Sequence, residues 1–276
     1  MPAEAGDGAV KANEVCLATV REYIEEKKRQ GEAIREIQCD VLFSTPTNGL
    51  PAGAGSEART SFISREDTFV ELGNPSVGSC AFLVWTHCLS AVRAGRITAI
   101  GPDIQDSEGQ SLPFGQVVIV GGGELKEEHY PDLQRTLYAV DQPEGYMLRS
   151  VPRRVWSRVG KEAAARGFSF ETLGLAIMST FRRKHPLVQA VEILFVTAGK
   201  EHVEQLDGIA AVMRSFGGGL SKLRRQDDGV YECAVYNCSA CDQKTVCDAI
   251  RKWITLRRGA GSLDAQGSLR LADAER

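Results

Sequence analysis

The chain has 276 residues, of which 43% are hydrophobic and 25% are charged, and its formal net charge at pH 7 is −3. This composition is typical of globular domains with a substantial core, and the charge balance argues against a basic nucleic-acid-binding protein. No apolar run approaches the ~20 residues of a membrane-spanning helix, and the N-terminus lacks the basic and apolar regions of a signal peptide. We therefore expect a cytoplasmic protein with neither a membrane segment nor a nucleic-acid partner.

The N-terminal part is predicted to be a helix followed by a linker. Residues 1–11 are rich in small and acidic residues, and we expect them to be disordered. From Asn13 to about Ile37, apolar residues recur at helical spacing among charged ones, which favours one helix. Residues 44–61 are rich in Pro, Gly, Ser and Thr, as is typical of a loop. Residues 1–60 are therefore interpreted as an N-terminal helix and linker.

A block of interleaved strands and helices follows. Strands are predicted at residues 68–72, 81–85, 96–100, 116–120 and 188–197, and helices at residues 125–139, 153–166, 170–180 and 202–216. Because the two kinds of element alternate imperfectly, we predict an α/β (α+β) fold with a mixed sheet flanked by helices, formed by residues 61–230. Residues 231–258 are expected to form a C-terminal cysteine-rich metal-binding segment and a helix, and residues 259–276 a disordered tail.

Four of the eight cysteines have the spacing C-x4-C-x2-C-x5-C: Cys233, Cys238, Cys241 and Cys247. In a reducing compartment, clustered cysteines are more often metal ligands than disulfides. Four thiolates suit a [4Fe–4S] cluster or tetrahedral zinc, and the absence of two CxxC pairs favours the cluster. A redox dithiol at Cys238 and Cys241 is a further alternative. The remaining cysteines are expected to be buried, inert thiols: Cys16, Cys39, Cys80 and Cys88.

A basic segment surrounds Trp156. Its cationic residues are Arg149, Arg153, Arg154, Arg158, Lys161 and Arg166. On a helix, Arg154 and Arg158 would share a face, with Lys161 one turn further along. Guanidinium groups bind phosphates and an indole stacks on an adenine, so Arg154, Trp156, Arg158 and Lys161 are candidate cofactor-binding residues. A solvated basic helix with Trp156 in the core is the alternative. The four histidines show no catalytic or metal-binding pattern, so no catalytic residue is identified.

Residues 66–247 resemble the beta subunit (acetyl-CoA synthase) of the carbon monoxide dehydrogenase/acetyl-CoA synthase complex. The resemblance rests on collinear segments: T-F-V-E-L-G-N-P (68–75), G-R-I-T-A-I-G-P-D-I (95–104), the stretch around Trp156 (150–174), and V-Y-N-C-S-A-C with T-V-C (235–241 and 245–247). It implies coenzyme A binding by arginines and a tryptophan, as in the middle domain of that family.

The sequence also departs from this family, as a truncated, divergent homologue would. The family's fourth cluster cysteine lies downstream of the third, whereas no cysteine follows Cys247 here and Cys233 must take that place. The C-G-C motif that holds nickel in the family is missing, so we expect no nickel and little synthase activity from this chain alone.

The combined prediction is an iron–sulfur protein that serves electron transfer or docking in a corrinoid/one-carbon (methyl-transfer, CO/acetyl-CoA) system. Its expected partner is a corrinoid protein, a methyltransferase or a CO dehydrogenase subunit. Two alternatives stay open. One is a coenzyme A-binding acyl- or methyl-transfer enzyme subunit whose metal site is completed by a partner, and the other is a module with a structural metal.

Overall fold

The computed structural model describes residues 5–39, 63–138, 143–151, 154–216, 224–225 and 231–232. The chain divides into two compact units, Met1–Gly218 and Gly219–Arg276. In the second unit, the described residues are the short antiparallel pair β10 (Arg224–Arg225) and β11 (Tyr231–Glu232). The predicted metal ligands lie outside the described residues: Cys233, Cys238, Cys241 and Cys247.

The first unit contains a five-stranded mixed sheet in the order β1-β4-β9-β6-β3. Its strands are β1 (Ile34–Gln38), β3 (Ser79–Thr86), β4 (Arg96–Ile100), β6 (Phe114–Gly121) and β9 (Ala190–Val196). The pairs β3–β6 and β4–β9 are parallel, whereas β1–β4 and β6–β9 are antiparallel. Every residue of β6 and β9 is buried, because a strand covered on both faces need not alternate apolar and polar residues.

A second mixed sheet of four strands has the order β5-β2-β8-β7. Its strands are β2 (Thr68–Leu72), β5 (Ser111–Leu112), β7 (Tyr146–Val151) and β8 (Arg154–Gly160). β2 and β5 are parallel, and β8 pairs antiparallel with both β2 and β7. The hydroxyl of Ser79 links the two sheets, since it donates to the carbonyl of Val155 (2.6 Å) and accepts from the Val155 N–H (2.8 Å).

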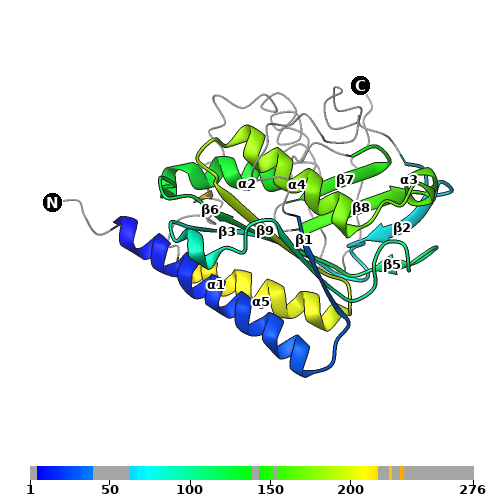
Figure 1. Ribbon diagram of the computed structural model, residues 1–276, viewed down its shortest axis with the longest axis horizontal. Helices are drawn as coiled ribbons and strands as arrows, with labels where there is room; N and C mark the ends of the chain where they lie inside the picture. Colours follow the sequence, from blue (N-terminus) through cyan, green and yellow to red (C-terminus); the bar gives the residue numbers. More distant parts are fainter. Residues whose placement is uncertain are drawn as a thin grey trace, which may run out of the picture. The chain divides into compact units, whose positions relative to one another are not determined.

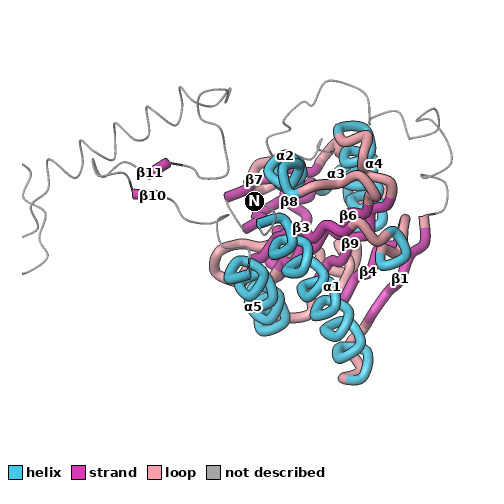
Figure 2. The backbone as a smooth tube through the Cα atoms, turned by 90° about the vertical axis from the view of Figure 1, so that its left-hand side faces the viewer, coloured by secondary structure: helices cyan, strands magenta, loops and turns pink. Residues whose placement is uncertain are grey.

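Helices cover both faces of the five-stranded sheet. They are α1 (Ala5–Arg29), α2 (Tyr130–Tyr138), α4 (Phe170–Lys184) and α5 (Lys200–Phe216), with the short turns η2 (Leu89–Ala91) and η3 (Glu127–His129). The short helix α3 (Lys161–Ala165) contacts β2 and β8 of the second sheet instead. α1 and α5 lie side by side on one face, and α2 and α4 lie on the other (Figure 1); Figure 2 shows the same layers turned by 90°. The core between α1, α5 and the sheet includes Val20, Ile24, Val84, Val117 and Leu206. Among the described helices, none is long and apolar enough to cross a bilayer.

The predicted class of a mixed sheet with flanking helices is confirmed, but the predicted N-terminal helix is wrong at both ends. α1 begins at Ala5, within the segment expected to be disordered, and ends at Arg29. Gly31 follows with a φ of 80°, which only glycine adopts without strain, and the chain then turns into β1. Ile34 and Ile37, which we predicted to extend the helix, pair with β4 instead. The predicted domain boundary at residues 60–61 lies outside the described residues, so the boundaries stay predictions.

The predicted helix at residues 153–166 is also wrong. Residues Arg154–Gly160 form the central strand β8, and only the five residues of α3 are helical. Val155, Ser157 and Val159 are buried. Their spacing of two places them on one face of the strand, and this burial together with pairing to two neighbouring strands outweighs local helix propensity.

Candidate functional site

The basic segment forms one face of β8. Because side chains alternate along a strand, Arg154, Trp156 and Arg158 lie on the face opposite the buried Val155 and Val159. Arg154 is exposed, and Trp156 and Arg158 are partly buried. The structure therefore brings three of the four predicted cofactor-binding residues onto one surface, although on a strand and not on a helix.

The other basic residues are arranged differently. Lys161 is exposed at the first position of α3, beyond the end of β8. Arg149 pairs with Trp156 across β7 and β8, but its side chain lies outside the described part, as does all of Arg153. Arg166 is exposed directly after the C-terminal end of α3 and pairs with Glu162 at 2.9 Å.

A carboxylate missed in the sequence organises this face. Glu71 lies on β2 directly opposite Arg158. Its oxygens accept hydrogen bonds from Arg158 Nε (3.0 Å), Asn74 Nδ2 (2.6 Å) and Ser111 Oγ (2.9 Å). Burial raises the pKa of Glu71, but hydrogen bonds from Asn74, Arg158, Ser111 and Trp156 outweigh burial and lower that pKa to about 2. Glu71 is thus a fixed negative charge on the same face of the sheet, next to Arg158.

The turn after β2 explains why this glutamate is followed by L-G-N-P. Gly73 has a φ of 69°, and a Cβ there would lie 2.1 Å from the carbonyl oxygen of Val155, so no other residue fits without moving β8. Asn74 Oδ1 accepts the N–H of Ser76 (3.0 Å) while its amide group holds Glu71. The E-L-G-N-P sequence was recognisable in the chain, but its role in holding Arg158 was not.

The charge of Arg158 is already neutralised. Its guanidinium pairs with Glu71 and also lies 5.5 Å from the centroid of the Trp156 ring, a cation–π arrangement. A phosphate would therefore gain less from Arg158 than predicted, since the Glu71 charge opposes the anion. The arrangement instead orients the indole and leaves Arg154 as the exposed guanidinium of this strand.

The described cysteines follow the prediction only in part. Cys16 and Cys80 are buried as expected, Cys39 is intermediate and Cys88 is exposed. Burial raises the pKa of Cys16 to about 12, whereas hydrogen bonding with Ser90 lowers that of Cys88. The inert-thiol prediction is wrong for Cys88 because β3 ends two residues earlier, at the sheet edge. Among the described residues, no group of three or more His, Cys, Asp or Glu side chains is placed to hold a metal ion.

Comparison with known proteins agrees with the resemblance. The family described as "CO dehydrogenase/acetyl-CoA synthase complex beta subunit" matches residues 50–203, a range that includes Glu71 and Arg158 and ends before the cysteine-rich segment. The acetyl-CoA decarbonylase/synthase complex subunit beta 1 of Methanosarcina thermophila is 30% identical over 226 residues, which cover 74% of this chain and 45% of the relative. The beta subunit of Methanothermobacter thermautotrophicus is 28% identical over 81% of this chain and 49% of its own length.

The chain spans about half the length of the relatives it matches. The family match covers more than half of the chain. The protein therefore belongs to the family of CO dehydrogenase/acetyl-CoA synthase complex beta subunits.

Proposed function

We propose that this protein is an iron–sulfur subunit that serves electron transfer or docking in a corrinoid/one-carbon system of the CO/acetyl-CoA type. The observation that carries the proposal is the set Cys233, Cys238, Cys241 and Cys247 in a chain of this family. The relatives are named as subunits of a multi-subunit complex. We accordingly propose a corrinoid protein, a methyltransferase or a CO dehydrogenase subunit as the partner.

The donor set suits a [4Fe–4S] cluster. Four thiolates within one short segment can each bind one iron of a cubane, and such a cluster supplies one-electron transfer. With all four irons held by protein thiolates, no coordination position stays open for bond formation. The sequence contains no C-G-C motif, so we expect this chain to need no nickel.

Metal analysis of anaerobically purified full-length protein tests the cluster. We expect about four irons and four sulfides per chain, as a cubane requires. Replacing any one of the four cysteines by Ser should lower the iron content, whereas Cys16→Ser should not, because Cys16 is buried in the α1–α5 core. Stoichiometric zinc without iron would contradict the cluster and favour a structural metal. Full iron content in Cys233→Ser would contradict the assignment of this fourth ligand.

Coenzyme A binding is a second candidate function, favoured by the exposed Arg154 beside the oriented indole of Trp156. In this proposal Arg154 contacts a phosphate of coenzyme A and the indole stacks on its adenine. The protein would then be an acyl- or methyl-transfer enzyme subunit whose metal site is completed by a partner. Calorimetry should give a micromolar Kd, or about −8 kcal/mol. Added salt should weaken the binding, since exposed charges are screened.

The exposed arginine gives the sharper test of this second function. Arg154→Ala should weaken coenzyme A binding at least tenfold without unfolding the protein. Arg166→Ala is the matched control, because Arg166 is also exposed but pairs with Glu162 outside the β8 face. A flat titration at millimolar coenzyme A, or equal losses in both variants, would contradict this function and leave the cluster proposal untouched.

A further inference from the structure

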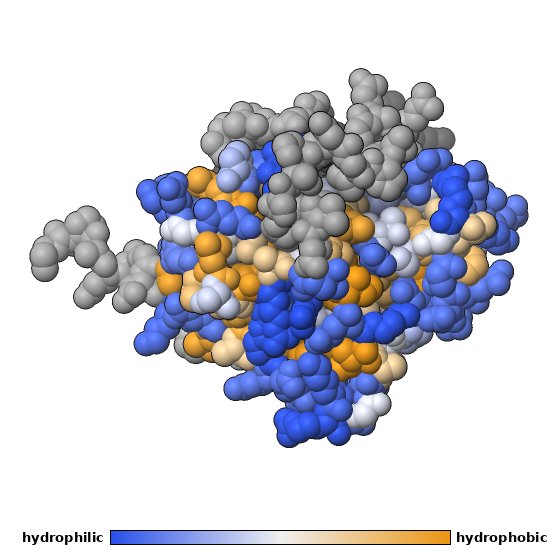
Figure 3. Space-filling model, viewed as in Figure 1, coloured by the Kyte–Doolittle hydropathy of each residue, from blue (hydrophilic) through white to orange (hydrophobic). Residues whose placement is uncertain are grey.

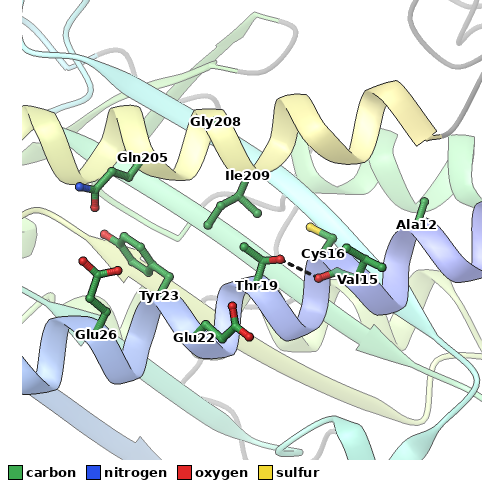
Figure 4. Close-up of a pocket in the computed structure, with 10 residues that line it drawn as sticks. All are labelled: Ala12, Val15, Cys16, Thr19, Glu22, Tyr23, Glu26, Gln205, Gly208 and Ile209. Atoms are coloured by element: carbon green, nitrogen blue, oxygen red, sulfur yellow. Dashed lines mark hydrogen bonds between the residues drawn. The ribbon is translucent and has the colours of Figure 1, made fainter.

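A groove runs between α1 and α5 on the solvent side of the helix pair. Tyr23 lies beside the start of α5, where its hydroxyl donates to the carbonyl of His202 (3.3 Å), and Ile209 lies beside the earlier residues of α1 (Figure 4). The two helices are therefore antiparallel neighbours. The hollow between them has a volume of about 420 Å³ and extends along α1 from Ala12 to Glu26. At 1.5 Å per residue this corresponds to about 21 Å, or about four helical turns.

The groove is largely apolar, and small side chains line its base. Ala12, Cys16 and Thr19 line it along one stripe of α1. Val15 beside them is 42% exposed, which is unusual for a large apolar side chain in the part of the chain that the structure describes. Figure 3 shows hydrophilic and apolar residues interspersed on the face of the molecule where α1 lies, whereas the floor of the groove is not visible in that view. Small floor residues let another helix approach closely, because packed helices insert the ridges of one into the grooves of the other.

Gly208 supports the same interpretation from α5. It lies within the helix, outside the left-handed region, so its backbone conformation does not require glycine. Among the described residues, no heavy atom lies within 4 Å of the position that a Cβ would occupy. Glycine weakens a helix interior relative to alanine. Neither the backbone nor packing against the described residues explains this glycine, whereas close contact with another polypeptide would.

The exposed charges along the groove are mostly acidic. The exposed cations Lys11, Lys28 and Lys200 lie just beyond it, where Lys28 pairs with Glu25 (3.1 Å) and Lys200 pairs with Glu204 (3.8 Å). From Ala12 to Glu26 on α1 and from Glu201 to Ala211 on α5, every exposed charged side chain is acidic: Glu14, Glu22, Glu25, Glu26, Glu201, Glu204 and Asp207. Glu22 and Glu26 line the groove itself. An acidic rim favours a basic partner, because complementary charges guide association and like charges oppose it.

We propose that this groove binds a basic amphipathic helix of another polypeptide, which places its apolar side chains over Ala12, Cys16 and Gly208 and its Lys or Arg side chains against Glu22 and Glu26. This is recognition of a helix in a groove, with specificity from the acidic rim. The proposal is independent of the cluster and of coenzyme A, since none of these groove residues belongs to either proposed site.

Site-specific photo-cross-linking in cells that produce the full-length protein tests the docking. A photoreactive residue at Val15 should form an adduct with one segment of another polypeptide, identified by mass spectrometry, that is net basic and has apolar residues every three or four positions. Leu89 is the matched control, because it is also 42% exposed but does not line the groove. The same residue placed there should not form this adduct.

Two further variants keep the test decisive. Gly208→Leu should lower the adduct yield at least tenfold while the protein stays folded, because no described residue occupies the space that the new side chain needs. Glu22→Lys with Glu26→Lys should also lower it at least tenfold, whereas Glu14→Lys with Glu25→Lys, an equal charge change outside the groove lining, should lower it much less. Absence of an adduct overturns the proposal. The proposal is also overturned by an adduct with this chain or a second copy of it, or by an adduct with an acidic segment. An unchanged adduct yield in folded Gly208→Leu protein overturns it as well.

Discussion

Replacing Glu71 by Gln should destabilise the protein, because Gln keeps the shape of the side chain but removes the charge that Arg158 faces. In the folded protein the pKa of Glu71 is lowered from 4.5 to about 2. At 1.36 kcal/mol per pKa unit, this corresponds to about 3 kcal/mol of preferential stabilisation of the carboxylate. The side chains of Glu71 and Arg158 are 14% and 16% exposed, so some screening by solvent applies. We therefore expect Glu71→Gln to lower the free energy of unfolding by about 2 kcal/mol at pH 7.

The loss should depend on pH with a defined sign. A carboxyl group whose pKa is lower in the folded state stabilises the protein above its unfolded pKa of 4.5, and this stabilisation is lost as the pH falls towards 2. The wild-type protein and the Gln variant should therefore converge in stability between about pH 5 and pH 2. Urea unfolding at pH 7, 5, 4 and 3, followed by circular dichroism, measures this convergence.

An exposed glutamate provides the control for this experiment. Glu14 is exposed on α1, and Glu14→Gln should change stability by less than about 0.5 kcal/mol at every pH, as is usual for surface substitutions. The reasoning would be refuted if Glu71→Gln had no effect at pH 7. It would also be refuted if the loss at pH 3 equalled the loss at pH 7, since the effect would then come from packing and not from the charge of Glu71.

Three further predictions concern the first unit. Glu192→Ala should lower the free energy of unfolding by about 3–5 kcal/mol, because Glu192 is 1% exposed and its loss leaves the charge of the partly buried Arg21 without its carboxylate. Denaturant unfolding measures this change, and a loss below about 1 kcal/mol would contradict the prediction. Gly208→Ala should raise stability by about 0.5–1 kcal/mol, since the Cβ meets open space and alanine favours helix, and a lower unfolding midpoint would contradict this. Cys88 should be alkylated well before Cys16 at pH 7.5. Cys88 is exposed and hydrogen bonding with Ser90 lowers its pKa, whereas burial raises the pKa of Cys16 to about 12. Peptide mass mapping of partly alkylated protein gives the order of reaction, and faster reaction of Cys16 would contradict the prediction.

Some of the fold could be predicted from the sequence because the signals were local. β2 and β4 occupy the predicted residues 68–72 and 96–100, since short runs rich in apolar and β-branched residues end there in glycine. α5 begins at Lys200 and ends at Phe216, close to the predicted helix of residues 202–216. The family was also recognisable, because several short segments in the chain resemble its motifs in collinear order. The strand and helix signals depend on neighbouring residues alone.

The secondary structure at the candidate site was decided only by tertiary structure. Arg154 and Arg158 share a face on a helix and on a strand alike, because a spacing of four fits both periods. What selects the strand is pairing with β2 and β7, and the partner of Arg158 is Glu71, 87 residues earlier in the chain. The same applies to Ile34 and Ile37, whose helical spacing was outweighed by pairing with β4. The periodicity of apolar residues in a sequence indicates which side chains become buried. Whether the segment forms a helix or a strand depends on backbone partners far away in the chain.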